Sequence, residues 1–218
     1  MIGDKLTYHP TYKDITNFVI SELRDKLINK GKICISIGGE SGCGKTSLAY
    51  ALIIDIENET GCKGYLFHGD DYFRLPPTDN HTNRLKNIKN VGVDEVNTEL
   101  LDTHILDFKN AISVVKPLVI YEENIIVTEQ VNSVEFDFCI VEGTYASLLI
   151  NTDYKLFLET TYLETLNSRI ERSRDIINDF NEKVLEIEHQ IIRNHKGLAD
   201  VIIDKDLRIS KPKKQSND

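Results

Sequence analysis

Short apolar runs alternate along this chain with longer stretches in which apolar residues recur every three or four positions. The runs predict buried strands, and the recurring positions predict amphipathic helices. The expected strands are 32–37, 65–68, 136–141, 154–158 and 201–203. The expected helices are 14–29, 47–59, 94–110 with Asp94 as its cap, 163–175 and 182–195. Two further runs, 118–121 and 125–128, flank a polar turn and predict a β-hairpin.

A polar segment, residues 70–93, interrupts this alternation. It contains Pro76-Pro77 and many asparagines, so we expect it to be rich in loops. Its most polar part, 79–84, is expected to be loop as well. Because this part follows the acidic pair at 70–71, it is a candidate wall for a substrate site.

Strands that alternate with helices predict an α/β fold, in which a mainly parallel sheet is covered by helices on both faces as a three-layer sandwich. The chain shows no internal repeat and no clear linker. We therefore expect one domain over 32–210. A helical extension over 1–31 is expected to pack on it, and 211–218 form a polar tail.

The composition of the 218 residues excludes some classes of partner. The chain has 26 Lys and Arg against 35 Asp and Glu, a net charge of −9, which argues against a protein that binds nucleic acid through its phosphates. No apolar run approaches the ~18 residues that a membrane span needs, and the first residues show no signal-peptide pattern. Four scattered cysteines predict reduced thiols and a cytoplasmic location. The sequence leaves open whether the protein forms a homo-oligomer.

The strongest motif is Gly39-Glu40-Ser41-Gly42-Cys43-Gly44-Lys45-Thr46, which fits the phosphate-binding pattern G-x-x-x-x-G-K-[ST]. It follows a predicted strand and opens a predicted helix, as the pattern requires. Lys45 is expected to reach the β- and γ-phosphates of ATP, and the Thr46 hydroxyl to bind Mg²⁺. The expected nucleotide-binding residues are Gly39, Glu40, Ser41, Gly42, Cys43, Gly44, Lys45, Thr46 and Ser47.

Acidic residues follow two of the buried strands. Asp70-Asp71 come after the strand at 65–68, and Glu142 comes directly after the strand at 136–141. Ligands of open α/β sheets bind at the carboxyl ends of the strands. Acids at these ends can hold Mg²⁺ or accept a proton from an attacking hydroxyl. The alternative is that each acid caps a turn in solvent.

Three arginines lie on the helix predicted at 163–175. Arg169 and Arg172 share one face, and Arg174 follows closely. They are candidate catalytic residues that would offset charge on the transferred phosphoryl group. The alternative is a solvated helix face on which acidic neighbours pair with them. The histidines of the chain show no metal-binding spacing.

These motifs, taken in order, resemble the uridine kinase/phosphoribulokinase family of P-loop kinases. The resemblance covers about residues 32–205 and rests on the phosphate-binding loop and four further elements. These are Asp70-Asp71-Tyr72-Phe73, Val141-Glu142-Gly143-Thr144-Tyr145, the Arg169–Asp175 segment and Ala199-Asp200-Val201-Ile202-Ile203.

The resemblance implies roles for individual residues. Asp70 corresponds to the catalytic base of the family, Glu142 to the acid near Mg²⁺, and Tyr121 to a residue beside the acceptor. The candidate acceptor contacts are Asp70, Asp71, Tyr72, Arg74, Tyr121 and Tyr145. Two segments, 122–126 and 74–80, differ from what uridine kinases usually carry.

The sequence thus predicts a kinase that uses ATP and Mg²⁺ to phosphorylate a hydroxyl of a small metabolite, with a nucleoside as the first candidate. Two alternatives stay open. One is a kinase for another acceptor, such as a sugar phosphate, a vitamin precursor or a nucleotide. The other is a nucleotide-binding switch without an acceptor. An acceptor that stimulates ADP release separates the kinases from the switch.

Overall fold

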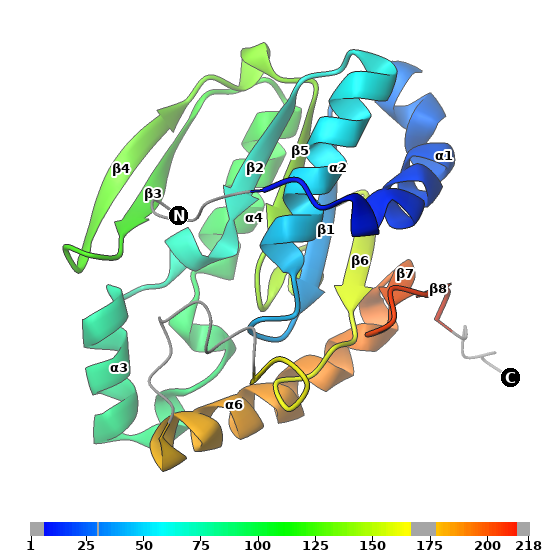
Figure 1. The fold of residues 1–218 in the computed structure, drawn as a ribbon. Coiled ribbons are helices and arrows are strands. Elements are labelled where there is room, and N and C mark those ends of the chain that lie inside the picture. Colours follow the sequence, from blue (N-terminus) through cyan, green and yellow to red (C-terminus); the bar gives the residue numbers. More distant parts are fainter. Residues whose placement is uncertain (1–6, 30, 167–177, 213–218) are drawn as a thin grey trace, which may run out of the picture.

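A six-stranded sheet forms the centre of the computed structural model, which describes residues 7–29, 31–166 and 178–212 (Figure 1). The strands in spatial order are β2 (Gly64–His68), β5 (Phe138–Glu142), β1 (Ile33–Gly39), β6 (Tyr154–Leu158), β7 (Val201–Ile203) and β8 (Ile209–Ser210). Neighbouring strands are parallel except for β8, which is antiparallel to β7. The predicted α/β fold with a mainly parallel sheet is confirmed, and β8 adds an edge strand that the pattern did not predict.

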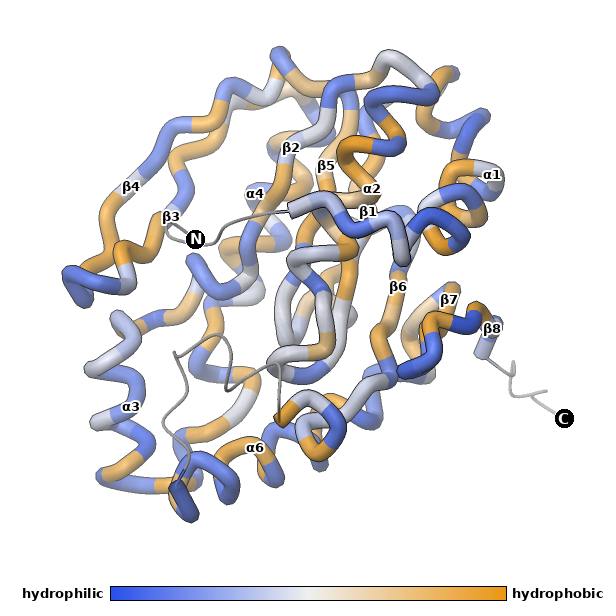
Figure 2. The backbone as a smooth tube through the Cα atoms, viewed as in Figure 1, coloured by the Kyte–Doolittle hydropathy of each residue, from blue (hydrophilic) through white to orange (hydrophobic). Residues whose placement is uncertain are grey.

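Helices cover both faces of this sheet, because successive strand residues point to opposite sides. Ile33, Ile35 and Ile37 of β1 pack with α1 (Lys13–Asn29) and α2 (Lys45–Thr60). Cys34 of β1 faces the other way and packs with α4 (Thr98–Lys109). The strands appear in Figure 2 as hydrophobic segments between these helices. The continuous apolar runs of the sequence therefore reflect strands that are buried on both faces.

The N-terminal helix α1 is fixed to α2 by a buried carboxylate. Asp55 of α2 is 3% exposed and accepts hydrogen bonds from Thr16 at 2.5 Å, from Lys13 at 3.0 Å and from Tyr8 at 3.2 Å. The apolar stripe of α1 closes the same core. Helix α1 of the N-terminal segment is therefore packed against α2 and the main sheet, and shares their hydrophobic core.

The predicted hairpin is present and longer than expected. Its strands, β3 (Val114–Ile120) and β4 (Ile125–Val131), pair only with each other among the described residues and project beside β2 (Figure 1). A buried ion pair ties it to the turn that follows β2: Lys116 Nζ lies 2.8 Å from the Asp71 carboxylate, with side chains 2% and 0% exposed. The amide of Val119 donates to the same carboxylate at 3.1 Å.

The expectation of a loop over 79–84 is wrong. Residues Pro77–Lys86 form helix α3, with proline at its first turn, where its missing N–H costs nothing. Asparagines have low helix propensity, so the pattern alone did not favour a helix here. The rest of 70–93 does consist of short turns of 3-10 helix and loops.

Two other helix boundaries also differ from the prediction. Helix α4 is capped by Asn97, whose side chain accepts from the amide of Leu100, so Asp94 is not the cap. Helix α6 (Asp179–Ile192) begins three residues earlier than predicted, because Asn178 caps it by accepting from Asn181. Most of the helix predicted at 163–175 lies outside the described residues.

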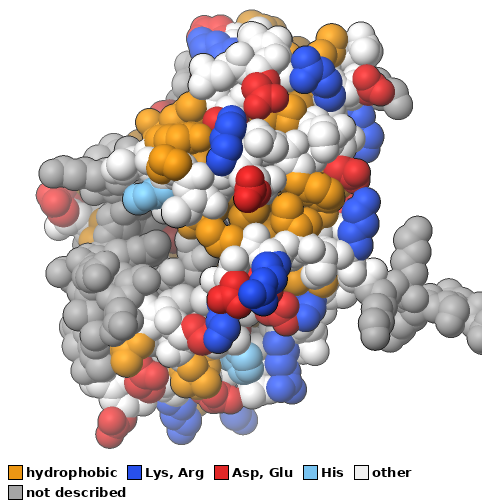
Figure 3. All heavy atoms as spheres, turned by 45° about the vertical axis from the view of Figure 1, so that its right-hand side comes forward, with side chains coloured by type: hydrophobic (Ala, Val, Ile, Leu, Met, Phe, Trp, Pro, Cys, Tyr) orange, Lys and Arg blue, Asp and Glu red, His pale blue; other side chains and the backbone are white. Residues whose placement is uncertain are grey.

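The described surface carries charged side chains of both signs. Acidic and basic side chains are interspersed on the face shown in Figure 3. None of the described helices is both long enough and apolar enough to cross a membrane. All four cysteines are free thiols, as the sequence predicted.

Candidate active site

The phosphate-binding motif forms the turn between β1 and α2. Gly44 caps α2 with a φ of 98°, and a Cβ at this position would lie 2.6 Å from the Tyr12 hydroxyl. Both the backbone angle and this close contact require glycine. No side chain caps the N-terminus of α2. Its first N–H groups are therefore available to an anion, and the helix dipole favours negative charge there.

The lysine of the motif is folded back onto its own loop. Lys45 is 9% exposed, and its Nζ donates to the backbone carbonyl of Glu40 at 2.7 Å. A buried ammonium that is held by one carbonyl is readily re-paired with a polyphosphate, which offers stronger charge-assisted hydrogen bonds. The geometry therefore suits the predicted role of Lys45.

Glu40 links the loop to two other elements. One oxygen of its buried carboxylate accepts from the amide of Tyr162 at 2.6 Å, and the other lies 2.7 Å from His189 Nδ1 of α6. Thr165 also donates to the carbonyl of Ser41 at 3.0 Å. Because the Glu40 side chain is engaged in these contacts, we expect Glu40 to contact a nucleotide through its backbone only.

The two predicted acids come together at the carboxyl ends of adjacent strands. His68 of β2 and Glu142 of β5 are register partners, and His68 Nδ1 lies 2.9 Å from Glu142 Oε1. The next residues are Gly69 and Gly143, and a Cβ on either would lie 3.1 Å from the Cα of the other. The two glycines allow this close approach, which places Asp70 beside Glu142 and the phosphate-binding loop.

Burial and neighbouring charges act differently on the two acids. Burial raises the pKa of Asp70, and the charge of Glu142 raises it further against the opposing effect of Lys45 and His68. Burial also acts to raise the pKa of Glu142, but the hydrogen bond from His68, the charges of His68 and Lys45 and a hydrogen bond from Thr46 lower it overall. Glu142 is thus held ionised, whereas Asp70 is shifted towards accepting a proton.

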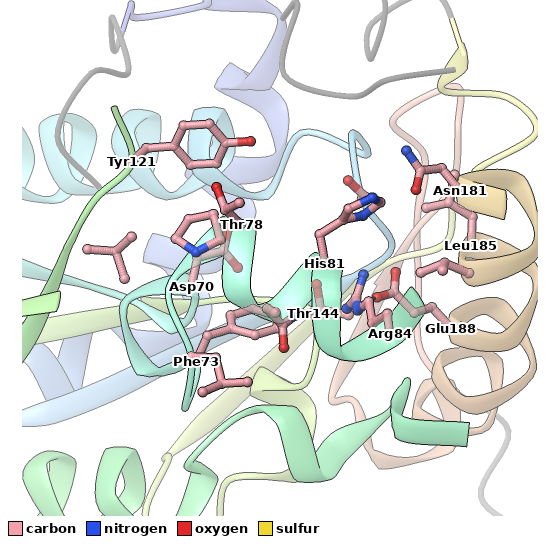
Figure 4. A pocket seen from close by; sticks show the side chains of 16 residues that line it. Asp70, Phe73, Thr78, His81, Arg84, Tyr121, Thr144, Asn181, Leu185 and Glu188 are labelled. Carbon is pink, nitrogen blue, oxygen red and sulfur yellow. Dashed lines mark hydrogen bonds and ion pairs between the residues drawn. The ribbon is translucent and has the colours of Figure 1, made fainter. Parts of the chain in front are cut away.

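A cavity of about 450 Å³ opens beside Asp70. Its walls come from the phosphate-binding loop, the Asp70–Phe73 turn, α3, the end of β3 and α6 (Figure 4). Asp70 and Tyr121 lie on one side of it in this view, and Arg84 and Glu188 lie on the other. Since Ser41 and Asp70 both line it, the cavity adjoins the phosphate site at Asp70.

The other predicted acceptor contacts are distributed unevenly around this cavity. Tyr121 lines it, at the end of β3. Asp71 and Tyr72 are buried in other interactions: Asp71 pairs with Lys116, and the Tyr72 hydroxyl lies 2.9 Å from His104 Nδ1. Arg74 is exposed and donates to the carbonyl of Asp94 at 3.0 Å.

Tyr145 lies behind the cavity wall. It is 3% exposed, and its hydroxyl has no hydrogen-bond partner among the described residues. Burial raises its pKa, and the nearby Glu188 and Glu95 carboxylates raise it further. The structure therefore does not place Tyr145 in direct contact with the cavity of about 450 Å³.

Two residues of the site were missed in the sequence: His68, which orients Glu142, and Glu188, which lines the cavity. Asn80 and Arg84 also line the cavity, and both belong to the segment 79–84 that the sequence made a candidate wall of the substrate site. For His68 a signal existed, since it ends a predicted strand beside a predicted acid. For Glu188 the sequence held none, because it lies on a helix far along the chain.

Arg84 joins three elements through its guanidinium. Nε and Nη2 bind the two oxygens of Glu95 at 2.6 and 2.9 Å, and Nη2 also donates to Glu188 at 2.8 Å. The side chains of Arg84, Glu95 and Glu188 are 16%, 3% and 11% exposed. Burial raises the pKa of Glu188, against the opposing charge of Arg84. This cluster fixes α3 against α6 at the far end of the cavity.

The candidate lid arginines Arg169, Arg172 and Arg174 lie outside the described residues. Among the described residues, no group of three or more His, Cys, Asp or Glu side chains could hold a metal ion. The Thr46 hydroxyl lies close enough to Glu142 to lower the pKa of its carboxyl, so the two groups are within reach of one small cation.

A curated protein and solved structures resemble this chain. The bifunctional alpha-galactosidase/sucrose kinase AgaSK of Mediterraneibacter gnavus is 30% identical over 192 residues, which cover 81% of this chain. The match spans only 20% of that protein, so this chain corresponds to about a fifth of its length.

Two solved structures show the same fold at low identity. One, described as a possible uridine kinase from Bacillus stearothermophilus, is 20% identical and has a TM-score of 0.59, covering 87% of this chain and 97% of its own. The other, D-glycerate 3-kinase from Cryptococcus neoformans, is 12% identical and has a TM-score of 0.58, covering 92% of this chain and 98% of its own.

The family model described as "Phosphoribulokinase / Uridine kinase family" matches residues 34–203. This match includes β1 from its second residue on, the phosphate-binding loop, both acids and the closing strand β7. It spans most of the chain and agrees with the arrangement of the sheet and the loop. The chain is therefore a P-loop kinase that belongs to the phosphoribulokinase/uridine kinase family.

Proposed function

We propose that this protein transfers the γ-phosphoryl group of ATP to a hydroxyl of an uncharged small metabolite. The observation that carries the proposal is the position of Asp70. It lines the cavity, lies beside the phosphate-binding loop, and has a raised pKa because of burial and the neighbouring Glu142. A carboxylate in this position can accept the proton of a hydroxyl that enters the cavity.

The proposed reaction assigns a task to each nearby group. Asp70 takes the proton of the acceptor hydroxyl as its oxygen bonds to the γ-phosphorus and the bond to the ADP oxygen breaks. Lys45 and the N–H groups of α2 bind phosphate oxygens. Arg169, Arg172 and Arg174 are proposed to add positive charge over the same phosphates.

Mg²⁺ is the proposed metal, because its donors would be oxygens. The Thr46 hydroxyl and the ionised Glu142 carboxylate would supply two of them, and Mg²⁺ usually takes its remaining ligands from water and substrate phosphates. When bound, the ion would neutralise charge on the transferred group. His68 keeps Glu142 oriented and ionised for this role.

The charge of the cavity supports an uncharged acceptor. The charged residues among its described lining are Asp70, Glu188 and Arg84, and Arg84 is already paired with two carboxylates. A phosphate or carboxylate on the acceptor would therefore meet more negative than positive charge. This makes a sugar phosphate, a nucleotide or glycerate a poorer candidate than a nucleoside or a free sugar.

Each of the two uncharged classes has its own support. A nucleoside is favoured by the aromatic rings of Phe73 and Tyr121, which line the cavity and offer faces for a base. A free sugar is favoured by the relative at 30% identity, which is described as a sucrose kinase. The aromatic rings serve a sugar as well, so we propose the two classes together.

An ADP-release assay with a panel of acceptors tests the proposal. The panel contains uridine, cytidine, fructose and sucrose as uncharged acceptors, with D-glycerate and ribulose 5-phosphate as charged ones. We expect an uncharged member to raise ADP release sharply. Stimulation by charged members alone would contradict the acceptor class, and slow ATP hydrolysis that no member changes would favour the nucleotide switch.

A further inference from the structure

The end of the cavity opposite Asp70 is built from two helices. Asn80 and Arg84 are four residues apart on α3 and so share one helix face, and Glu188 comes from α6. All three line the cavity. The rings of His81 and Phe180 also meet edge to face at 5.6 Å, which holds α3 and α6 together beside these residues.

Asn80 is the most informative of the three. The residue is only 8% exposed, and its side-chain amide makes no hydrogen bond within the described parts of the chain. The fully buried polar atoms that lack a partner in these parts do not include the Asn80 amide, so this amide still reaches the solvent of the cavity and has unused hydrogen-bonding capacity. Because Asn80 lines the cavity, a molecule that enters the cavity can supply the missing partner.

Arg84 and Glu188 also have unused capacity on the cavity side. Three of the five guanidinium N–H donors of Arg84 are engaged through Nε and Nη2, and Nη1 has no partner among the described residues. Glu188 uses one oxygen for Arg84, and its second oxygen has no partner in the same part of the chain. The pair thus offers donors and an acceptor side by side.

A hydroxyl group both donates and accepts a hydrogen bond. Two neighbouring hydroxyls of a sugar or ribose can therefore bind together to an amide, a guanidinium and a carboxylate. A carboxylate or phosphate ligand could not donate to Glu188 and would be repelled by it. The chemistry of this end of the cavity thus matches a diol and disfavours an anion.

We propose that Asn80, Arg84 and Glu188 form the acceptor-recognition site and bind hydroxyl groups of the acceptor. This orients a different hydroxyl towards Asp70. The inference rests on the proposed function, since it identifies how the same cavity selects its substrate. It makes the polar face of α3 a determinant of specificity.

Calorimetry on the full chain tests the site separately from catalysis. Binding of uridine, cytidine, fructose and sucrose is measured with Mg²⁺ and a non-hydrolysable ATP analogue present. For the member that binds best, Asn80→Ala should weaken binding about tenfold, which corresponds to the loss of about 1.4 kcal/mol. The affinity for the ATP analogue should be unchanged, because Asn80 lies on the acceptor side.

Asp79→Ala is the matched control, since Asp79 is the exposed neighbour of Asn80 and does not line the cavity. It should bind the acceptor as the natural chain does. If Asn80→Ala lowers the melting temperature, Glu188→Gln gives a second measurement with a side chain of similar size, again with an expected loss of about tenfold.

The outcomes separate the two proposals. Equal binding by the natural chain and by Asn80→Ala would overturn the recognition site and leave the kinase function standing. The site would also be refuted if none of the four probes bound the natural chain. Binding that Asn80→Ala weakens, without ADP release from the natural chain, would uphold the site and contradict the kinase function.

Discussion

The phosphate side and the acceptor side of this active site are built in different ways. The phosphate side is one continuous turn between β1 and α2, and the ligand contacts proposed for it come largely from backbone N–H groups. The acceptor side is assembled from α3, the hairpin and α6, and its central contact joins Arg84 to Glu188, 104 positions apart. A local motif can be recognised from the residue order, whereas an assembled wall depends on packing.

The two sides meet at Asp70, so substitutions on each side can be tested separately. A substitution on the phosphate side should weaken ATP binding, whichever acceptor is present. A substitution on the acceptor side should weaken binding of the acceptor and leave ATP binding intact. The following predictions test this separation.

The largest effect is expected from Asp70→Asn. The amide keeps the size of the carboxylate and cannot accept the proton, so turnover should fall by about 10²–10⁴-fold. Binding of ATP should be nearly unchanged, as measured by titration of a fluorescent ATP analogue. Unaltered turnover would reject Asp70 as the base, and loss of ATP binding would show that the two sides are not separable.

Lys116→Ala should destabilise the acceptor side. It leaves the Asp71 carboxylate buried at 0% exposure without its ion partner, which typically costs about 3–5 kcal/mol. Urea denaturation measures the loss. The double variant Asp71→Asn/Lys116→Met should recover part of it, because neither residue then carries a charge. A loss below about 1 kcal/mol would mean that the ion pair does not hold the hairpin.

Thr16→Val tests the helical layer behind the phosphate side. It removes the buried hydrogen bond to the Asp55 carboxylate and should cost about 1.5–3 kcal/mol of stability. Kinase activity below the melting transition should stay the same. Ser21→Ala is the control, since Ser21 is exposed and bonds only to its own helix, and should change stability by less than about 0.5 kcal/mol. Equal effects of the two variants would show that Asp55 does not anchor α1.

The smallest predicted effect is on the pH dependence. Asp70 must be ionised to act as a base, and its pKa is raised from 3.8 by burial and by Glu142. The kcat/KM for the acceptor should therefore rise about tenfold per pH unit below this raised pKa and level off above it. A rate profile from about pH 4 to pH 8 measures this, and an acid limb at or below the unshifted pKa would contradict the assignment.

Much of the fold could be predicted because its strands are marked by short runs of neighbouring apolar residues. The apolar runs of β1, β5 and β6 are continuous since both faces of these strands are buried, and they were recognised within a residue or two of their ends. Helix α3 could not be recognised in the same way. Its asparagines disfavour a helix in isolation, and its contacts with Glu95 and Glu188 come from distant elements.

The candidate site likewise contains residues that could be selected from the sequence and residues whose orientation only the structure shows. Lys45, Asp70 and Glu142 could be selected as candidates because each lies at a strand end or in a loop whose place in an α/β sheet is known in advance. Asp71 and Tyr72 adjoin Asp70 in sequence but turn away from the cavity into buried contacts. Adjacent residues of a tight turn point in different directions, and the sequence does not show which of them faces the cavity.

The sequence by itself determined the parallel sheet, the phosphate-binding loop and the pair of acids, because strand burial and backbone phosphate binding depend on nearby residues. Only the tertiary structure decided which side chains line the cavity. That choice depends on how α3 and α6 pack across the cavity, and the packing is set by contacts between residues about 100 positions apart. The proposed class of acceptor therefore rests on the side chains of the assembled wall.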